Sequence, residues 1–477
     1  MKTCVVGGGP AGLTIAWILS KLNHDVTLID REASLGGCHR VRRVRVDGKD
    51  LFTEHGPRVY LSNFVNFWNV LKDMGYDHNK IFTKYKVNFP VGLKDAVNTF
   101  SLRELLILLV YFIVFMVNKD YFKKLSVEDM VDRYNFSEKT KLYLDKICRL
   151  TDGAGIDRYT AYEMFQLVNQ GAFYNLLEPV KPNDELLFKL IEESLINNGV
   201  KIVKNAEVTK LFENGDKISG CQVGDKYFEC DNMILSIPLF NIVKLLKNSG
   251  NKIEDSFLEI NDLESYSKKV EYESYLPVTL YWNEYIEIPD IWGNGFGDWG
   301  IIWVDMTNYM DFGKNHPKTV LSTSIVMLNQ KSSKTGKTAN QTSDVEQLKQ
   351  EAVRQVLEIL KVPNPDYTVL SPGVYRQNNK WLTQDKAYIL TPDYKPLKFQ
   401  SNKYSNLFNV GTHNEQNNIG YTSLESATQN AIVFLNRYFK DSKKVIQIEK
   451  IYTLDKTFKI LIITVLVVIL IKNNKKY

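Results

Sequence analysis

The chain has 477 residues, of which 44% are hydrophobic, 12% aromatic and 24% charged. This composition excludes a disordered chain, a disulfide-stapled miniprotein and a polytopic membrane protein. Lysine and arginine (60) nearly balance aspartate and glutamate (55), and a net charge of +5 gives no electrostatic argument for nucleic-acid binding. At roughly 150 residues per domain, the length predicts two or three domains or one large interleaved fold.

The cysteines and histidines carry no metal or disulfide signature. The five cysteines contain no CxxC pair, and their odd number favours a reducing compartment. The six histidines are isolated, without HExxH spacing. We therefore predict no dedicated metal site.

The N-terminus has the pattern of a βαβ unit. Residues 3–6 predict a first strand, residues 13–22 have the apolar spacing of a helix, and residues 26–29 predict a second strand. Between the first strand and the helix lies Gly-Gly-Gly-Pro-Ala-Gly, residues 7–12. Three consecutive glycines and a proline argue against a secretory signal here.

Three of these glycines have the spacing of a dinucleotide-binding fingerprint. In this pattern Gly7 permits a tight turn, Gly9 lets the backbone approach a pyrophosphate, and Gly12 lets helix and strand pack closely. The helix N-terminus that follows stabilises phosphate charge. Asp30 ends the second strand, where a carboxylate accepts hydrogen bonds from ribose hydroxyls. We therefore predict a dinucleotide site at the N-terminus.

The next segment indicates which dinucleotide is bound. A Gly-Gly pair at residues 36–37 follows Asp30 after five residues, and Phe-Thr-Glu-His-Gly-Pro-Arg occupies residues 52–58. With these motifs the chain resembles the FAD-binding flavin amine oxidase superfamily, which includes monoamine oxidase, protoporphyrinogen oxidase and phytoene desaturase. The stretch from Glu54 to Arg58 most resembles protoporphyrinogen oxidase and the desaturases. The resemblance implies that the cofactor is FAD.

Two later blocks agree with this resemblance. Residues 199–208 and 231–238 resemble the second FAD segment of the superfamily, where a valine, here Val208, contacts the adenine end. Residues 411–427 resemble its C-terminal block, which places a helix N-terminus near the flavin. The residues that the fingerprint and the resemblance assign to FAD are Gly7, Gly9, Pro10, Ala11, Gly12, Asp30, Arg31, Gly37, Arg40, Gly56, Pro57, Arg58, Val208, Gly411 and Thr422.

The resemblance also implies the fold. We expect an α/β architecture in which a Rossmann-like FAD-binding domain is discontinuous and carries an inserted α+β substrate domain. The FAD-binding domain is expected at residues 1–95, 196–245 and 396–440. The substrate domain is expected to have a mostly helical part at residues 96–195 and a β-rich part at residues 246–395. A basic linker at residues 441–457 and an apolar segment at residues 458–472 follow.

The motifs depart from the superfamily pattern at three places. Cys38-His39-Arg40 follows the Gly-Gly pair where arginine or lysine is usual, which displaces Arg40 by two positions. A second Gly-Gly pair is absent from residues 179–185, and Thr428-Gln429 replaces a Ser-Gly pair. These departures motivate one alternative function, a degenerate flavoprotein that acts as a membrane scaffold or interaction partner.

No catalytic residue is assigned by a motif. By rough position, Lys268 and Lys269 are candidates for the lysine that amine oxidases place near flavin N5, although exposed surface lysines are the favoured interpretation. Trp381, Tyr388 and Tyr394 are candidates to face the flavin, with ordinary core packing as an equal alternative. Hydride transfer depends more on positioning than on an acid or base, so a missing dyad does not exclude chemistry.

Two apolar runs stand out. Residues 460–471 would span roughly 18 Å as a helix, against a hydrocarbon core of about 30 Å, but the flanking lysines can snorkel. We expect this run to be a C-terminal transmembrane anchor, and the six lysines between residues 440 and 459 to keep the folded domain in the cytosol. Residues 105–117 predict either a buried helix that lines the substrate chamber or a helix in monotopic membrane contact.

The expected function is an FAD-dependent oxidoreductase. It would oxidise a C–N or C–C bond of a small, lipophilic substrate by hydride transfer to flavin N5. A second alternative is a non-redox isomerase like UDP-galactopyranose mutase, because residues 55–63 loosely echo that family. The sequence identifies neither the substrate nor an oligomeric state.

Overall fold

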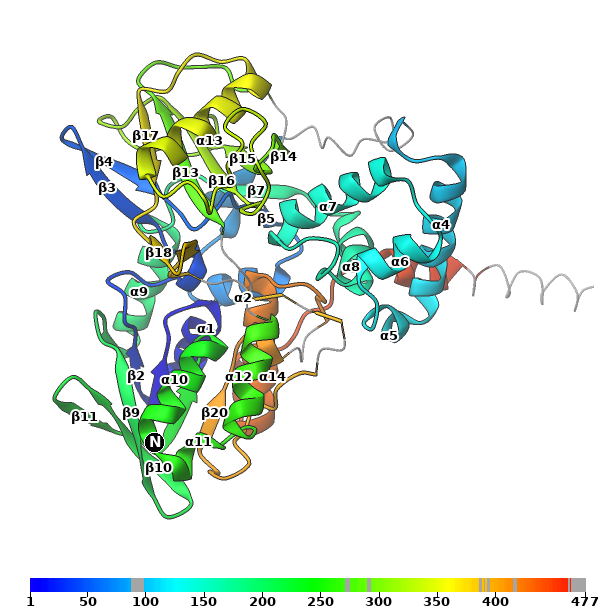
Figure 1. The fold of residues 1–477 in the computed structure, drawn as a ribbon. Coiled ribbons are helices and arrows are strands. Elements are labelled where there is room, and N and C mark those ends of the chain that lie inside the picture. Colours follow the sequence, from blue (N-terminus) through cyan, green and yellow to red (C-terminus); the bar gives the residue numbers. More distant parts are fainter. Residues whose placement is uncertain are drawn as a thin grey trace, which may run out of the picture.

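The computed structural model describes residues 1–86, 98–270, 275–289, 293–385, 388–389, 391–392, 395–414, 418–461 and 464. Figure 1 shows three regions: a parallel sheet with its helices at the bottom, an antiparallel sheet at the top, and a lobe of helices to one side. Segments far apart in the sequence meet in each of the two sheet regions.

A five-stranded parallel sheet carries the dinucleotide fingerprint. Its strand order is β20-β12-β1-β2-β8, so the order of the strands reverses beside β1. The strands come from three separate parts of the chain: β1 (Lys2–Val6), β2 (Asp25–Ile29), β8 (Lys201–Val203), β12 (Asn232–Leu235) and β20 (Leu407–Asn409). The prediction of an α/β, Rossmann-like fold is confirmed.

Both faces of this sheet are covered, because successive side chains of a strand point to opposite faces. Val5 packs in one core with helices α1 (Pro10–Lys21) and α14 (Leu424–Tyr438). Cys4 and Val6 pack in a second core with α10 (Leu239–Ser249) and an antiparallel sheet. The elements on that side are β9 (Val208–Asn214), β10 (Lys217–Val223), β11 (Lys226–Glu229), α11 (Asn251–Glu254) and α12 (Ile260–Val270).

An antiparallel sheet forms the second region, with strand order β14-β15-β16-β13-β17. Its central strands β13 and β16 are buried along their whole length, and helix α13 (Val345–Leu360) packs its apolar face on the sheet. The strands and the two adjacent hairpins are β13 (Leu276–Trp282), β14 (Gly293–Phe296), β15 (Ile301–Asp305), β16 (Thr319–Ile325), β17 (Tyr367–Leu370), β3 (Arg42–Val46), β4 (Lys49–Thr53), β18 (Val374–Gln377) and β19 (Lys380–Thr383).

The third region is helical and packs around a core of aromatic side chains, among them Phe115, Phe122 and Phe165. Serine and threonine caps begin several of its helices, since their hydroxyls satisfy first-turn amides. Its helices are α4 (Leu102–Val117), α5 (Lys119–Phe122), α6 (Val127–Arg133), α7 (Glu138–Asp152) and α8 (Ala161–Gly171). A small sheet connects it to the rest: β5 (Tyr60–Leu61), β7 (Leu176–Pro179) and β6 (Phe82–Lys84), near α2 (Val65–Asp73) and α9 (Leu187–Asn197).

The segment expected to be a basic linker lies against the body of the molecule. Ile446 and Ile451 are buried in the core that holds α1 and α14, and the short helix α15 (Ser442–Val445) precedes them. The Glu449 amide donates to Asn66 Oδ1 (2.8 Å), and the Asp455 amide donates to Asn169 Oδ1 (2.8 Å). Apolar side chains within the basic sequence explain the difference, because their burial fixes the segment in place.

The predicted C-terminal transmembrane helix is not supported. Within the described ranges, no helix is both long enough and apolar enough to cross a bilayer. Residues 454–461 are helical, and most of the predicted anchor, residues 462–463 and 465–472, lies outside the described residues.

Candidate functional site

The glycine-rich turn after β1 is built around positions where no side chain fits. Gly7 has a φ of +107°, and a Cβ there would overlap the Ser236 carbonyl, which begins the turn after β12. A Cβ at Gly12 would overlap the Gly7 carbonyl oxygen, so this glycine allows α1 to pack against the turn. The structure therefore gives Gly7 and Gly12 the packing roles that the fingerprint predicts.

Gly9 lies between them and is different, because only one heavy atom outside its chain neighbours would lie within 4 Å of a Cβ placed there. The nearest atom to a Cβ at Gly9 is Gly37 Cα, at 3.7 Å, and a Cβ at Gly37 would lie 3.0 Å from Gly9 Cα. Pro10 and Ala11 open helix α1 directly behind this point, with Pro10 in the first turn. The two glycine backbones and the helix N-terminus form a cradle in which an anion meets amide groups rather than side chains.

Asp30 lies at one side of this cradle and is buried. Its carboxylate accepts from the Gly8 amide (2.5 Å) and from the Glu32 amide (2.8 Å). The Ala206 amide donates to the Asp30 carbonyl (3.0 Å), which brings the start of β9, and with it Val208, to this side. Arg31 instead pairs with Glu32 (3.1 Å) at the surface. Asp30 and Val208 thus lie at the edge where the sequence predicts the adenosine half of the cofactor.

Arg40 is part of a buried ion network rather than directed at the cradle alone. Its Nη1 lies 2.7 Å from Asp385 Oδ1 and 3.3 Å from Glu32, and Arg42 also pairs with Asp385 (3.1 Å). Arg40 Nε has no hydrogen-bond partner among the described residues. Asp385, which the sequence did not indicate, therefore joins the β19 region to the segment after the Gly-Gly pair.

Residues 54–58 cross the interior between the parallel and antiparallel sheets. A Cβ at Gly56 would lie 3.2 Å from Ser324 Oγ on β16, so the backbone passes close to that strand, and Pro57 follows. Arg58 donates to the Cys38 carbonyl, but its Nε and both ring nitrogens of the buried His55 lack partners in the described structure. Burial, together with the nearby Arg58 charge, lowers the pKa of His55 to about 3, so this imidazole is neutral.

Two buried glutamates face the same interior. Ser322 Oγ donates to Glu54 Oε1 (2.7 Å), and burial raises the pKa of Glu54 to about 7, with Arg58 acting in the opposite direction. Glu178 on β7 is 1% exposed, and neither of its carboxylate oxygens has a hydrogen-bond partner among the described residues. Burial raises the pKa of Glu178 well above its ordinary value, and the charges of Glu54 and Asp305 add to this effect. These two carboxyl groups can hold protons near neutral pH.

Between the cradle and these glutamates lies a polar connection. His39, two residues after Gly37, places Nδ1 3.2 Å from Tyr60 Oη, and Asn183 Nδ2 donates to the same Tyr60 oxygen (2.8 Å). Burial lowers the pKa of His39 well below its ordinary value and raises that of Tyr60, so both side chains are uncharged. The FAD motifs of the sequence marked neither Tyr60 nor Asn183.

The C-terminal block meets the site from the other side. Val410 donates its amide to the Leu235 carbonyl (2.9 Å), and Gly411 follows at the end of β20. Thr422 immediately precedes the N-cap of α14, Ser423, so both lie at the end of the sheet that carries the glycine cradle. Glu425 has a role the sequence did not indicate: its carboxylate accepts from the Asn66 amide (3.1 Å) and the Phe67 amide (2.9 Å) in the first turn of α2.

Several of the buried polar atoms that lack a hydrogen-bond partner among the described residues fit an elongated polar cofactor. Such atoms run from the glycine turn to the antiparallel sheet, and each costs about 1–3 kcal/mol if it stays unsatisfied. They belong to Ser236 Oγ, Arg40 Nε, Arg58 Nε, His55, Asn183 Oδ1, Glu178 and Ser324 Oγ. A dinucleotide with its pyrophosphate at Gly9 and Gly37 would supply hydrogen-bonding groups along this path.

Of the positional candidates for catalysis, Lys268, Lys269 and Trp381 lie away from this path. Lys268 and Lys269 are exposed at the end of α12, where Lys268 pairs with Glu264 (2.8 Å), so the interpretation as surface lysines holds. Trp381 packs in the core under the antiparallel sheet and donates to the Ala339 carbonyl (3.1 Å). Tyr388 lies against Tyr266 (3.4 Å between hydroxyls), and Tyr394 lies outside the described residues.

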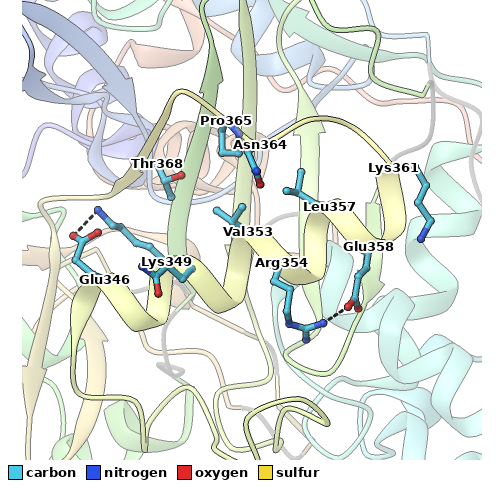
Figure 2. Close-up of a pocket in the computed structure, with 11 residues that line it drawn as sticks. Glu346, Lys349, Val353, Arg354, Leu357, Glu358, Lys361, Asn364, Pro365 and Thr368 are labelled. Carbon is cyan, nitrogen blue, oxygen red and sulfur yellow. Dashed lines mark hydrogen bonds and ion pairs between the residues drawn. The ribbon is translucent and has the colours of Figure 1, made fainter.

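A surface groove on the antiparallel-sheet region is distinct from this site. It lies over α13, and Figure 2 shows its charged walls, where Glu346 pairs with Lys349 (2.7 Å) and Arg354 pairs with Glu358. These four charged side chains are paired with one another. The groove offers no chemistry comparable with the interior path.

The comparisons with known proteins agree with this geometry. Residues 5–74 match the family model described as an NAD(P)-binding Rossmann-like domain. The 4,4'-diapolycopen-4-al dehydrogenase of Metabacillus indicus is 22% identical over 284 residues, which is 50% of this chain and 55% of that protein. The hydroxyneurosporene desaturase of Rubrivivax gelatinosus is 42% identical over 64 residues, 13% of this chain and 11% of that protein. The chain thus covers about half, or less, of these relatives.

Solved structures extend the likeness to the whole fold. A putrescine oxidase bound to putrescine superimposes with a TM-score of 0.62 and 13% identity, over 92% of this chain and 99% of that one. An identity this low establishes the shared fold and nothing finer.

Proposed function

We propose that the chain is an FAD-dependent oxidoreductase of the amine oxidase superfamily that oxidises a C–N or C–C bond. Two observations carry the proposal. The backbones of Gly9 and Gly37 approach each other with no side chain between them. Buried polar atoms that lack partners among the described residues extend from there towards Glu54 and Glu178. The curated relatives are a dehydrogenase and a desaturase by name, which favours redox chemistry over the isomerase and scaffold alternatives.

In this proposal the two halves of the site have different tasks. The cradle at Gly9 and Gly37 holds the pyrophosphate, Asp30 and Val208 face the adenosine, and Arg40, Arg58, Gly56, Gly411 and Thr422 border the flavin half. Bound FAD supplies an acceptor for a hydride.

The proton released with the hydride needs an acceptor from the chain itself. Glu54 is suited to this, because burial raises its pKa to about 7, where a carboxylate can take up a proton near neutral pH. Burial raises the pKa of Glu178 well above its ordinary value and so favours its protonated form. Tyr60 and Asn183 lie between these groups and the cradle, and orient the site through their shared hydrogen bond. We propose an apolar substrate, in keeping with the lipophilic expectation from the sequence.

The purified full chain tests the cofactor and the reaction in order. We expect the two visible absorption bands of oxidised flavin, either as isolated or after FAD is added. Anaerobic mixing with a panel of polyenes, porphyrinogens and amines should bleach these bands for one class only. A preparation that stays colourless with added FAD contradicts the cofactor, whereas a yellow preparation that no class bleaches contradicts the reaction.

We further propose that the C-terminal segment attaches the protein to a membrane, with the folded body in the cytosol. The support is the apolar run at residues 460–471 between lysines. Leu466→Lys together with Ile469→Lys should shift the full chain from the carbonate-washed membrane fraction to the supernatant. Protease added outside sealed cells should leave the body intact, and cleavage there would contradict the orientation.

A further inference from the structure

Helix α4 exposes an apolar stripe along its entire length. Its exposed apolar side chains are between 41% and 78% accessible and recur at helical spacing on one face. They are Leu102, Leu106, Leu109, Val110, Ile113, Val114 and Val117. A contiguous patch of this kind on a folded protein marks an interaction surface rather than a scattered exposed residue.

The opposite face of α4 is fully used by the fold, so the stripe is not a misplaced core. Phe115 is buried, with its ring 5.7 Å from those of Phe122 and Phe165. Glu104, one of the two charged residues of the helix, is committed to capping, since it accepts from the amides of Ser101 (2.7 Å) and Ser137 (2.7 Å). The buried face of α4 is therefore fixed by packing and capping contacts, and its exposed face is apolar.

The C-terminal part of the chain is held beside the end of this stripe. Asp455 pairs with Lys119 (3.2 Å), two residues after α4 ends, and with Lys459 (3.6 Å). Ile460 and Leu461, the first residues of the C-terminal apolar run, are 63% and 60% exposed. Figure 1 shows α4 at the outer edge of the helical lobe and the last described residues beside that lobe. Two exposed apolar surfaces thus lie on one side of the molecule.

We propose that the α4 stripe docks on the surface of a lipid bilayer, with the helix axis in the membrane plane. The stripe runs the whole helix, roughly 22 Å at 1.5 Å per residue, so contact along its length requires the helix to lie flat. Lysines follow the stripe at residues 119, 123 and 124. Lys119 pairs with Asp455 and Lys123 pairs with Asp120 (3.1 Å), whereas Lys124 has no ion pair among the described residues and suits an anionic headgroup. The proposal resolves the alternatives for residues 105–117 towards membrane contact, and it does not depend on the flavin chemistry.

A fluorescent label on the full chain tests this contact without interference from the C-terminal segment. Val110→Cys and Ile196→Cys, at positions 57% and 54% exposed, are each labelled with an environment-sensitive NBD dye. The vesicles contain phosphatidylcholine and phosphatidylserine, with or without spin-labelled lipid. We expect spin-labelled lipid to quench the dye at position 110 about threefold more than at position 196 on α9. The labelled parent chain gives the background from its own cysteines.

Each other outcome overturns the proposal. A dye at position 110 that keeps its water-like emission while the protein sediments with vesicles means that only the C-terminal segment binds lipid. A blue shift that appears without vesicles and grows with protein concentration means that a second copy covers α4. If the chain does not sediment with vesicles at all, neither α4 nor the C-terminal segment binds the bilayer. Leu106→Cys repeats the measurement if the first variant fails to fold, as judged by circular dichroism.

Discussion

Neighbouring glycines of one motif have separable roles. A Cβ at Gly9 meets no atom closer than 3.7 Å, so Gly9→Ala leaves the fold intact but fills the space that a pyrophosphate would occupy. A Cβ at Gly12 overlaps the Gly7 carbonyl and forces α1 away from the turn. We expect Gly9→Ala to weaken FAD binding by about tenfold or more at an unchanged thermal midpoint. Gly12→Ala should lower the free energy of unfolding by about 1–3 kcal/mol.

FAD fluorescence titration and thermal unfolding of the cofactor-free chain separate the two effects. If Gly9→Ala also lowers the thermal midpoint, the open space at this position is needed for packing and the cradle interpretation fails.

Glu54 should make the stability of the cofactor-free chain depend on pH. Burial raises the pKa of this carboxyl to about 7 from 4.5. Because the pKa of Glu54 is raised in the folded state, its protonated carboxyl contributes to the free energy of unfolding. That contribution is fully present below pH 4.5 and is lost as the pH rises to 7. Between pH 4.5 and 7 the free energy of unfolding of the wild-type chain should fall by about 3 kcal/mol from this group. The Glu54→Gln variant should not show this decrease.

Urea unfolding of both chains at several pH values measures this difference, since the substitution removes one titrating group and leaves the others. A difference between wild type and Glu54→Gln that stays constant from pH 4.5 to 8 would show that the Glu54 carboxyl is solvated.

At the scale of elements, one carboxylate joins two helices. The N-cap of α2 is Phe64, which offers no side-chain acceptor, and Glu425 from α14 satisfies the amides of Asn66 and Phe67 instead. Glu425→Ala leaves these donors buried and unpaired, so we expect a loss of about 3 kcal/mol in the free energy of unfolding. The measurement is the thermal midpoint with circular dichroism.

Glu346→Ala is the matched control, because Glu346 also lies in the first turn of a helix but its side chain is 67% exposed. We expect this control to cost less than about 1 kcal/mol. Equal losses in the two variants would mean that Glu425 does not support α2.

The same contrast explains how far the sequence could predict the structure. The βαβ unit and the positions of Gly7, Gly12 and Asp30 follow from local patterns, because turn geometry and strand periodicity are local properties. The contacts of Asp385, Glu178 and Asn183 join residues more than a hundred positions apart, and no local pattern reports them. The linker expectation failed for a related reason, since isolated Ile446 and Ile451 gave no periodic signal among the lysines.

Across the whole molecule, Asp385 links the parallel-sheet region to the hairpin beside the antiparallel sheet. It pairs with Arg40 and Arg42, and the side chains of Arg40 and Asp385 are each only 8% exposed. Removal of one partner from a buried ion pair leaves an uncompensated charge, which costs about 3–5 kcal/mol. Asp385→Ala should therefore lower the free energy of unfolding by that amount and weaken FAD binding, because Arg40 also approaches the cofactor cradle through Glu32.

The neighbouring pair of Arg43 and Asp184 provides the control. Its distances are similar, at 2.9 and 3.1 Å, but its side chains are 23% and 25% exposed. Asp184→Ala should cost about 1 kcal/mol and leave FAD affinity unchanged, since solvent screens the remaining arginine. If Asp385→Ala loses stability but keeps its FAD affinity, the network only fastens the two regions together. A parallel loss of both would mean that the domain contact itself shapes the cofactor site.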